Sequence, residues 1–246
     1  MTFDVDIRKL PDISKFSGLL SDRVYLAMRS AILSMDFKPG QIIRKAPLCA
    51  YMGISRSPVA DAIQKLSGEG LVDVVPQSTT RVTKLSIEDI RESAFLREAL
   101  ELASVARAVQ FRTNDQLAQL SRNLRIQAML VEDNDLNELY RYDAEFHEIL
   151  MDCSGIMSLQ PTVEAVSLQV NRARALLLPE PGRSEETVKE HRQIYEAVKE
   201  RDASAAQAAL KSHLGQLILR LEPLQQSRPE LFETAKTKKR IVHESQ

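Results

Sequence analysis

The feature that most constrains the fold is a helical periodicity that runs through the C-terminal half of the chain without a convincing strand. Apolar residues recur there at three- and four-residue intervals, which places them on one face of each predicted helix. Turn and cap signals separate the segments, among them Thr113-Asn114, Ser154-Gly155 and the run from Pro179 to Gly182. We therefore expect an antiparallel bundle of six helices, over residues 87–111, 115–131, 135–152, 156–178, 184–201 and 202–222.

Residues 20–85 carry a different pattern. A first helix from Leu20 is expected to end at Lys38-Pro39-Gly40, a second spans residues 46–52, and a third opens at Ser55-Arg56-Ser57-Pro58, with Ser55 as its side-chain cap. Residues 71–75 and 81–83 read as strands joined by a turn. Three helices and a β-hairpin form a winged helix-turn-helix, which presents its last helix to the DNA major groove. The alternative is a small helical protein-interaction module. Either way the fold class is mainly α.

Length and charge agree with this division. The 246 residues suffice for two domains, which we place at 1–85 and 86–222, followed by a basic tail at 223–246. Their formal net charges are +4, −7 and +2, so the N-terminal part suits a polyanionic partner. No apolar run approaches the roughly 20 residues of a membrane span, and no signal pattern opens the chain, so we expect a cytoplasmic protein. The two cysteines, Cys49 and Cys153, are expected to be buried free thiols.

Three of the four histidines fall in helices of the predicted bundle. Asp143 and His147 are four residues apart and so project from one helix face. His191 and His213 lie at similar distances from the turn between the last two helices, which places them at one level of the bundle. One carboxylate and three imidazoles suit a divalent metal, with zinc as the first candidate and nickel or manganese as others, and leave positions open for a ligand oxygen. The alternative is four separately satisfied polar residues.

The N-terminal motifs resemble a known family. The run Lys38-Pro39-Gly40, the stretch from Leu48 to Val59 and the stretch from Leu66 to Val72 look like the DNA-binding domain of GntR-type bacterial regulators. The resemblance implies that Arg44, Arg56 and Ser57 contact DNA, and we add Ser55 beside them. The chain departs from the family pattern at Ala60, where an arginine is usual, and at Ser78-Thr79-Thr80, which replaces a basic, glycine-containing wing tip.

The C-terminal motifs resemble the FCD domain, the effector-binding bundle of one GntR subfamily, the FadR group. The matching elements are the run from Asp143 to His147, Glu190-His191 and His213. The resemblance implies a metal at the floor of a cavity that receives a small organic acid, with Arg97 facing that effector. The expected count of six helices points to the VanR-like branch. A surface salt bridge with Glu101 is the alternative role for Arg97.

Two further basic features are candidates. Arg172 and Arg174 interrupt an apolar helical pattern, so either they line a carboxylate-binding cavity or they are snorkelling surface residues. The tail, with Lys236, Lys238, Lys239 and Arg240, could contact DNA phosphates, although such tails are usually disordered.

Together these features favour a metabolite-responsive transcription regulator that binds operator DNA as a homodimer. A metalloenzyme or a sensor of the metal itself is the alternative use of an Asp/His3 site. No candidate general base accompanies the metal residues, so we expect no catalysis.

Overall fold

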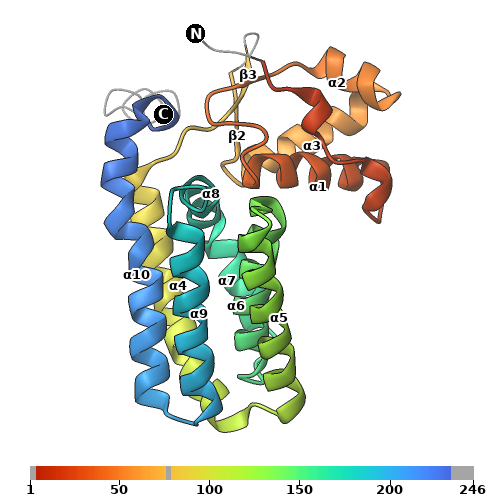
Figure 1. Cartoon of the computed structure of the whole chain (residues 1–246). Coiled ribbons are helices and arrows are strands. Elements are labelled where there is room, and N and C mark those ends of the chain that lie inside the picture. Colours follow the sequence, from red (N-terminus) through yellow and green to blue (C-terminus); the bar gives the residue numbers. More distant parts are fainter. Residues whose placement is uncertain (1–3, 76–78, 234–246) are drawn as a thin grey trace, which may run out of the picture. The chain divides into compact units, whose positions relative to one another are not determined.

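The computed structural model describes residues 4–75 and 79–233. The chain divides into two compact units, Met1–Ser86 with Gln225–Gln246, and Ile87–Leu224 (Figure 1). The expectations for Ser78 at the wing tip and for the basic residues 236–240 lie outside the described residues. Within the described ranges, no helix is both long enough and apolar enough to span a bilayer.

The first unit is a winged helix-turn-helix, as predicted. Its helices are α1 (Leu20–Leu33), α2 (Lys45–Met52) and α3 (Arg56–Gly68), preceded by short 3-10 turns at Ile7–Lys9 and Ile13–Lys15. Strands β2 (Val72–Val74) and β3 (Thr80–Val82) form the predicted hairpin, and β1 (Ile42–Ile43) pairs with β3, giving the antiparallel order β1-β3-β2. The third strand was not predicted because two residues are too short to show an alternating pattern.

Two local expectations in this unit are wrong. The first helix ends at Leu33 and not at Lys38, because Met35 has a left-handed φ of 65° that breaks the helix. Met35 is nevertheless buried, as the apolar periodicity of the sequence predicts. Ser55 adopts the extended N-cap conformation before α3, but its hydroxyl makes no cap hydrogen bond.

The core of the first unit lies where α1, α2, α3 and the sheet meet. Apolar positions of α1 and α3 recur every three or four residues and face each other. Its fully buried side chains include Met28, Ile32, Phe37, Leu48, Ile63, Leu66 and Leu71. This packing holds the start of α3 at the surface, where Ser55, Arg56 and Ser57 are exposed.

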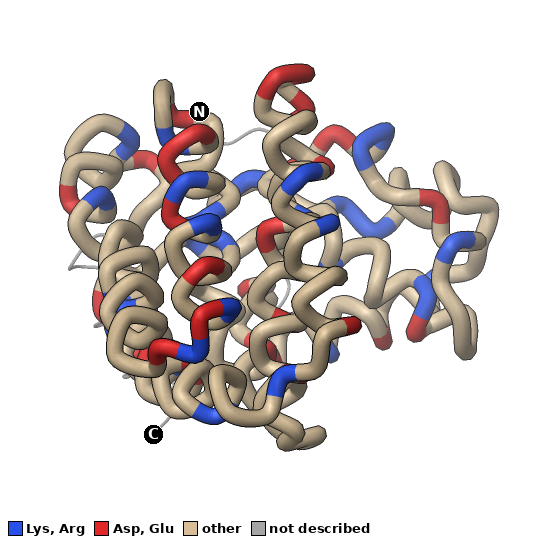
Figure 2. The backbone as a smooth tube through the Cα atoms, turned by 60° about the horizontal axis from the view of Figure 1, so that its bottom comes forward, with Lys and Arg blue, Asp and Glu red and all other residues tan. Residues whose placement is uncertain are grey.

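The second unit is the predicted antiparallel bundle (Figure 1). Thr113 and Gln116 form a capping box at the start of α5 (Asn114–Glu132), the second helix of the bundle, which confirms the predicted cap at Thr113. Figure 2 shows acidic and basic residues interspersed along its helices. Its elements are α4 (Ile87–Phe111), α5 (Asn114–Glu132), α6 (Leu136–Asp152), α7 (Leu159–Val166), α8 (Leu168–Leu177), α9 (Arg183–Lys199) and α10 (Ala203–Ser227).

Two helix boundaries differ from prediction. The single helix expected over 156–178 is two helices, α7 and α8, which meet at Ser167. Val163 and Val170, on either side of the break, are both buried, so the apolar periodicity continues across it and the break could not be predicted from the pattern. The unit thus has seven helices, and the helix-count argument for a VanR-like branch no longer holds. Helix α10 also continues through Pro223 to Ser227, since the flanking Leu221 and Leu224 are buried.

The bundle core is apolar and surrounds one polar cluster. Both cysteines are free and buried, as expected, Cys49 in the first unit and Cys153 in the bundle. The main cluster of buried apolar residues in the bundle includes Val105, Ala108, Leu120, Leu124, Phe146, Leu150, Ile194, Val198 and Leu210.

Candidate functional site

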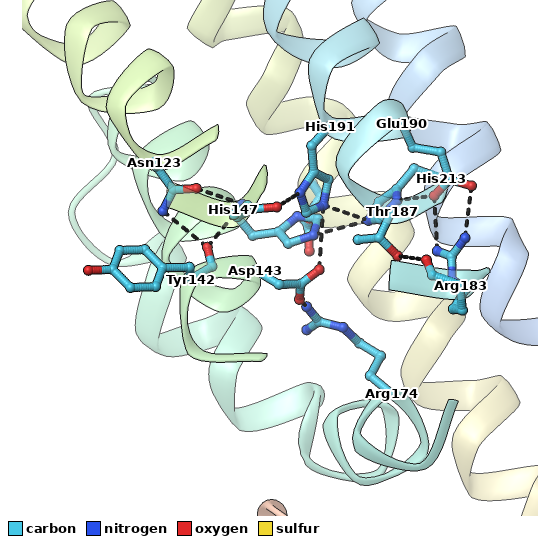
Figure 3. Close-up of polar contacts among 12 residues, drawn as sticks. Asn123, Tyr142, Asp143, His147, Arg174, Arg183, Thr187, Glu190, His191 and His213 are labelled. Carbon is cyan, nitrogen blue, oxygen red and sulfur yellow. Dashed lines mark hydrogen bonds and ion pairs between the residues drawn. The ribbon is translucent and has the colours of Figure 1, made fainter. Parts of the chain in front are cut away.

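Four polar residues converge in the interior of the bundle (Figure 3). Asp143 and His147 come from α6, His191 from α9 and His213 from α10, and all four are buried. One ligand atom of each lies within 4.8 Å of the other three. The Nε2 atom of His213 is 3.2 Å from that of His147 and 3.3 Å from that of His191, whose Nε2 is 3.5 Å from Asp143 Oδ1.

Local structure explains this convergence. The four-residue spacing of Asp143 and His147 places both on one face of α6. Helices α9 and α10 are joined by a tight turn in which Arg201 has a φ of 59°, so they run antiparallel and bring His191 level with His213. Packing of Phe146 against the His191 ring, with centroids 4.2 Å apart, fixes the α6 face against α9.

The outer nitrogen of each histidine has a side-chain acceptor, which is buried for Glu101 and Gln127 and partly buried for Glu190. Glu101 Oε2 is 2.8 Å from Nδ1 of His147, Gln127 Oε1 is 2.9 Å from Nδ1 of His191, and Glu190 Oε2 is 2.7 Å from Nδ1 of His213. Because each Nδ1 donates its proton outward, each Nε2 carries a lone pair that points inward. Metal-ligating histidines are held in this way.

The tautomer of His191 is fixed by an amide chain on α5. The Gln127 side-chain nitrogen donates to Asn123 Oδ1 at 2.6 Å and to the Tyr142 carbonyl at 3.3 Å (Figure 3). Its oxygen is therefore the atom that faces His191, and it can only accept. Gln127 is fully buried, so its side chain is not exposed to bulk solvent.

The histidines are neutral in this environment. Burial lowers the pKa of His147, lowers that of His191 well below the usual range, and lowers that of His213 to about 4 in spite of the hydrogen bond with Glu190. Burial by itself would raise the pKa of the Glu101 carboxyl, but Arg97 and His147 beside it lower that pKa well below its ordinary value. Neutral imidazoles and ionised carboxylates are the forms in which these groups bind metals.

The donor set fits a divalent metal. Three inward lone pairs at separations of 3.2 and 3.3 Å repel one another unless a cation lies between them. A tetrahedral ion with bonds of about 2.0 Å to nitrogen has ligand atoms roughly 3.3 Å apart, close to the separations found here. Three nitrogens and one carboxylate oxygen are a set that zinc, nickel and manganese accept.

Gln127 is expected to contribute to metal affinity through His191. We expect Gln127→Met, which keeps the length and removes the hydrogen bond, to lower zinc affinity about 10–100-fold, because His191 then loses its fixed tautomer. A titration against a competing chelator measures this. Gln119→Met is the matched control, since Gln119 is exposed on the same helix. Equal zinc affinity in the parent and Gln127→Met would show that the amide does not orient His191.

Arg97 is buried beside this cluster. Its Nε donates to Glu101 Oε1 at 2.5 Å, so the four-residue salt bridge considered as an alternative exists, but inside the bundle and not on its surface. Glu101 therefore links Arg97 to His147. Sequence reasoning missed this role of Glu101 because the histidine it binds is 46 residues away.

The other two arginines have different surroundings. Arg174 on α8 forms an ion pair with Oδ2 of Asp143, on the side away from His191 (Figure 3). Arg172 is fully buried, and its Nη1 donates to Gln169 Oε1 at 3.1 Å. Neither is a snorkelling surface residue. Of the two, only Arg174 lines the two hollows that reach the cluster.

Two hollows reach the cluster. The α7 hollow is lined by His147, Glu101 and residues of α7, and the α10 hollow by Asp143, His213 and residues of α8, α9 and α10. Arg97 and Arg174 line both. The full lining of the α10 hollow is Ala94, Arg97, Tyr140, Asp143, Val170, Arg174, Leu177, Leu178, Arg183, Thr187, His213, Leu214 and Leu217.

The predicted DNA-contact residues lie in the first unit. Ser55, Arg56 and Ser57 are exposed at the N-terminus of α3, the helix expected to read DNA. Arg44 precedes α2, and its exposed side chain pairs with Asp4 through a 2.7 Å contact. An exposed pair of this kind exchanges readily for a phosphate.

Comparison with known proteins adds two matches to family models. Residues 20–82 match the family of bacterial regulatory proteins named gntR, and residues 92–216 match the FCD domain. A transcriptional regulator of the HTH type from an unstable DNA locus of Streptomyces ambofaciens is 34% identical over 86% of this chain and 89% of its own length. The transcriptional repressor RspR of Escherichia coli is 27% identical, over 87% of this chain and 93% of its own length.

Solved structures share the fold. The E. coli protein McbR/YncC superposes with a TM-score of 0.73 at 22% identity, over 84% of this chain and 99% of its own. A GntR-type transcriptional regulator from Rhodococcus sp. RHA1 gives a TM-score of 0.70 at 22% identity, over 82% of this chain and 97% of its own.

Proposed function

Because this chain belongs to the GntR family of bacterial regulatory proteins and carries an FCD domain, we propose that it is a metabolite-responsive transcription regulator of the FadR subfamily. It binds operator DNA as a homodimer in the cytoplasm, and a small carboxylate bound at the Asp/His3 centre controls that binding. The family consists of transcriptional regulators and not enzymes. The centre therefore serves recognition and not catalysis.

The observation that carries this proposal is the hollow beside the four ligand residues. Asp143 and His213 line the α10 hollow together with Arg97 and Arg174, so a molecule in it reaches both the metal ligands and two guanidinium groups. A bound divalent ion supplies a Lewis-acidic site for hard oxygen donors.

Charge favours an anion in this position. Three carboxylates, Asp143, Glu101 and Glu190, are matched by three guanidinium groups, of Arg97, Arg174 and Arg183, through the ion pairs already described and the paired contacts of Arg183 with Glu190 at 2.9 Å. A divalent ion bound to neutral histidines adds two positive charges to this balance, of which a monocarboxylate offsets one and a dicarboxylate both.

Control of DNA binding requires unequal affinity. An effector alters operator binding only if it binds the DNA-competent and incompetent states differently. Helix α10 supplies His213 to the centre, and the same helix continues past Leu224 into the segment assigned to the first unit. A shift of α10 on effector binding is therefore transmitted along a covalent path toward the DNA-binding unit.

The experiment that tests this function uses Arg97. We expect Arg97→Lys to weaken carboxylate binding about tenfold while leaving the metal content unchanged, because lysine keeps the charge but loses the planar two-point contact. Calorimetry with a panel of carboxylates, on zinc-loaded and zinc-stripped protein, measures both effects. Arg91→Lys is the control, since Arg91 is exposed on the same helix and pairs with Glu222.

Two results would contradict the proposal. Carboxylate binding that is the same with and without zinc would exclude the metal from the pocket. Operator binding that is lost on chelation, restored by metal alone and unaffected by every carboxylate would identify a metal sensor in place of an effector sensor.

A further inference from the structure

The lining of the α10 hollow indicates which carboxylate fits. Building on the proposed function, we infer that the effector is a monocarboxylate with an unsubstituted aliphatic chain of about four to six carbons. The inference comes from the arrangement of charged and apolar side chains in the hollow. Its apolar lining consists of Ala94, Val170, Leu177, Leu178, Leu214 and Leu217.

Along the helix axes, the charged and the apolar lining residues of α4 and α10 lie about one helical turn apart. Helices α4 and α10 run antiparallel, as the pairing of Arg91 with Glu222 and the hydrogen bond from Gln207 to the Leu102 carbonyl show. Ala94 is three residues before Arg97, and Leu217 is four residues after His213. Because the two helices are antiparallel, Ala94 and Leu217 are both displaced from the charged residues in the same direction, by about one helical turn. A carboxylate held at the charged level thus directs its chain toward Ala94 and Leu217.

Helix α8 also contributes apolar side chains to the lining of the α10 hollow. Arg174 is flanked by Val170 one turn before it and by Leu177 and Leu178 one turn after it, and all three of these apolar residues line the hollow. Leu214 of α10 completes the set. The guanidinium of Arg174 donates from Nη1 to Oδ1 of Asn171 on the same helix at 3.1 Å, and the other residues that α8 contributes to the α10 hollow are aliphatic.

The polar groups in the rest of the lining are already engaged. The Tyr140 hydroxyl donates to the Asn171 carbonyl at 3.1 Å, and the Thr187 hydroxyl donates to the Arg183 carbonyl at 2.9 Å. Both terminal nitrogens of Arg183 bind Glu190 at 2.9 Å. The hydroxyl protons of Tyr140 and Thr187 are therefore committed to backbone carbonyls and the Arg183 guanidinium is paired with Glu190, and burying an unpaired ligand hydroxyl is unfavourable.

The same geometry limits the chain length. One helical turn rises about 5.4 Å, and an extended alkyl chain advances roughly 1.3 Å per carbon–carbon bond, so about four bonds cover the distance from the charged level to the apolar one. A second carboxylate at the far end of such a chain would lie against Ala94 and Leu217, and Arg183, the remaining cation of the lining, is already paired with Glu190, which disfavours dicarboxylates of that length.

Calorimetry on the zinc-loaded, full-length protein tests the inference with matched acids. Affinity should rise about fourfold for each methylene added from propanoate to hexanoate, the factor expected for burial of one methylene. The ω-hydroxylated acid 6-hydroxyhexanoate and the dicarboxylate adipate should each bind about tenfold more weakly than hexanoate. Hydroxylated or dicarboxylic acids that bind as tightly as hexanoate would overturn the aliphatic specificity and leave the proposed function intact. Failure of every carboxylate to bind would overturn both.

Variants of the apolar wall provide a second test. Leu217→Gln should reduce the preference for hexanoate over 6-hydroxyhexanoate to about threefold or less, with zinc content unchanged. Ala94→Ser is a milder variant of the same wall and should shift the preference in the same direction. Leu219→Gln is the control, because Leu219 is exposed on the same helix. A preference that is unchanged in both folded wall variants would show that the chain does not lie against this wall.

Discussion

Replacing His191 by alanine is expected to remove most of the bound divalent metal and to abolish carboxylate binding while the bundle stays helical. His191 is fully buried, and its Nε2 lies within 3.5 Å of both His213 Nε2 and Asp143 Oδ1, so the variant loses a central donor. The loss should exceed the about 10–100-fold weakening that removal of an outer hydrogen-bond partner causes. Elemental analysis of purified protein measures the metal, and circular dichroism measures the helix content.

Two further variants complete this test. His147→Ala should also lose metal, and it guards against a packing effect of His191→Ala, since the His191 ring is stacked on Phe146. His243→Ala is the matched control, because His243 is the one histidine outside the bundle sequence. One metal ion per chain retained in both bundle variants would refute the Asp/His3 centre.

Replacing Arg56 by alanine is expected to weaken operator binding about 5–150-fold, the range for loss of one base-edge contact worth about 1–3 kcal/mol. Arg56 is exposed in the first turn of α3, where the positive end of the helix dipole also favours an anion. The arginine that the family usually carries further along is Ala60 here, so Arg56 provides the cation nearest the start of this helix. Titrations with an operator fragment selected from a random-sequence library measure the effect.

The salt dependence separates two kinds of contact. A phosphate contact would lower the slope of affinity against salt by about one and weaken all sequences alike, whereas a base contact would relax the preference at one position. Arg8→Ala is the control, because Arg8 is an exposed cation of the first unit paired with Asp6, remote in sequence from α3. Equal operator affinity for the parent and Arg56→Ala at several salt concentrations would refute the assignment.

The sequence by itself predicted most of the elements and the four residues of the Asp/His3 cluster. Local hydrogen bonding and apolar periodicity determine most of the helices, so α3, α4 and a helix cap at Thr113 could be predicted without tertiary information. The four-residue spacing of Asp143 and His147 belongs to a single helix and needs no fold. His191 and His213 could be related because one short turn joins their helices.

Only the tertiary structure decided what surrounds these residues. Gln127 and Glu101 reach their histidines across 64 and 46 residues of sequence, and no local pattern marks such pairs. Arg172 and Arg174 are two residues apart on α8 and so point to different faces, and only the packing of this helix decides that Arg174 meets Asp143 and the hollows. The sequence thus determined which groups can bind a metal, through spacing within single helices. The packing of helices against one another determined their tautomers, their ion pairs and the shape of the cavity beside them, because these depend on contacts between residues far apart in the chain.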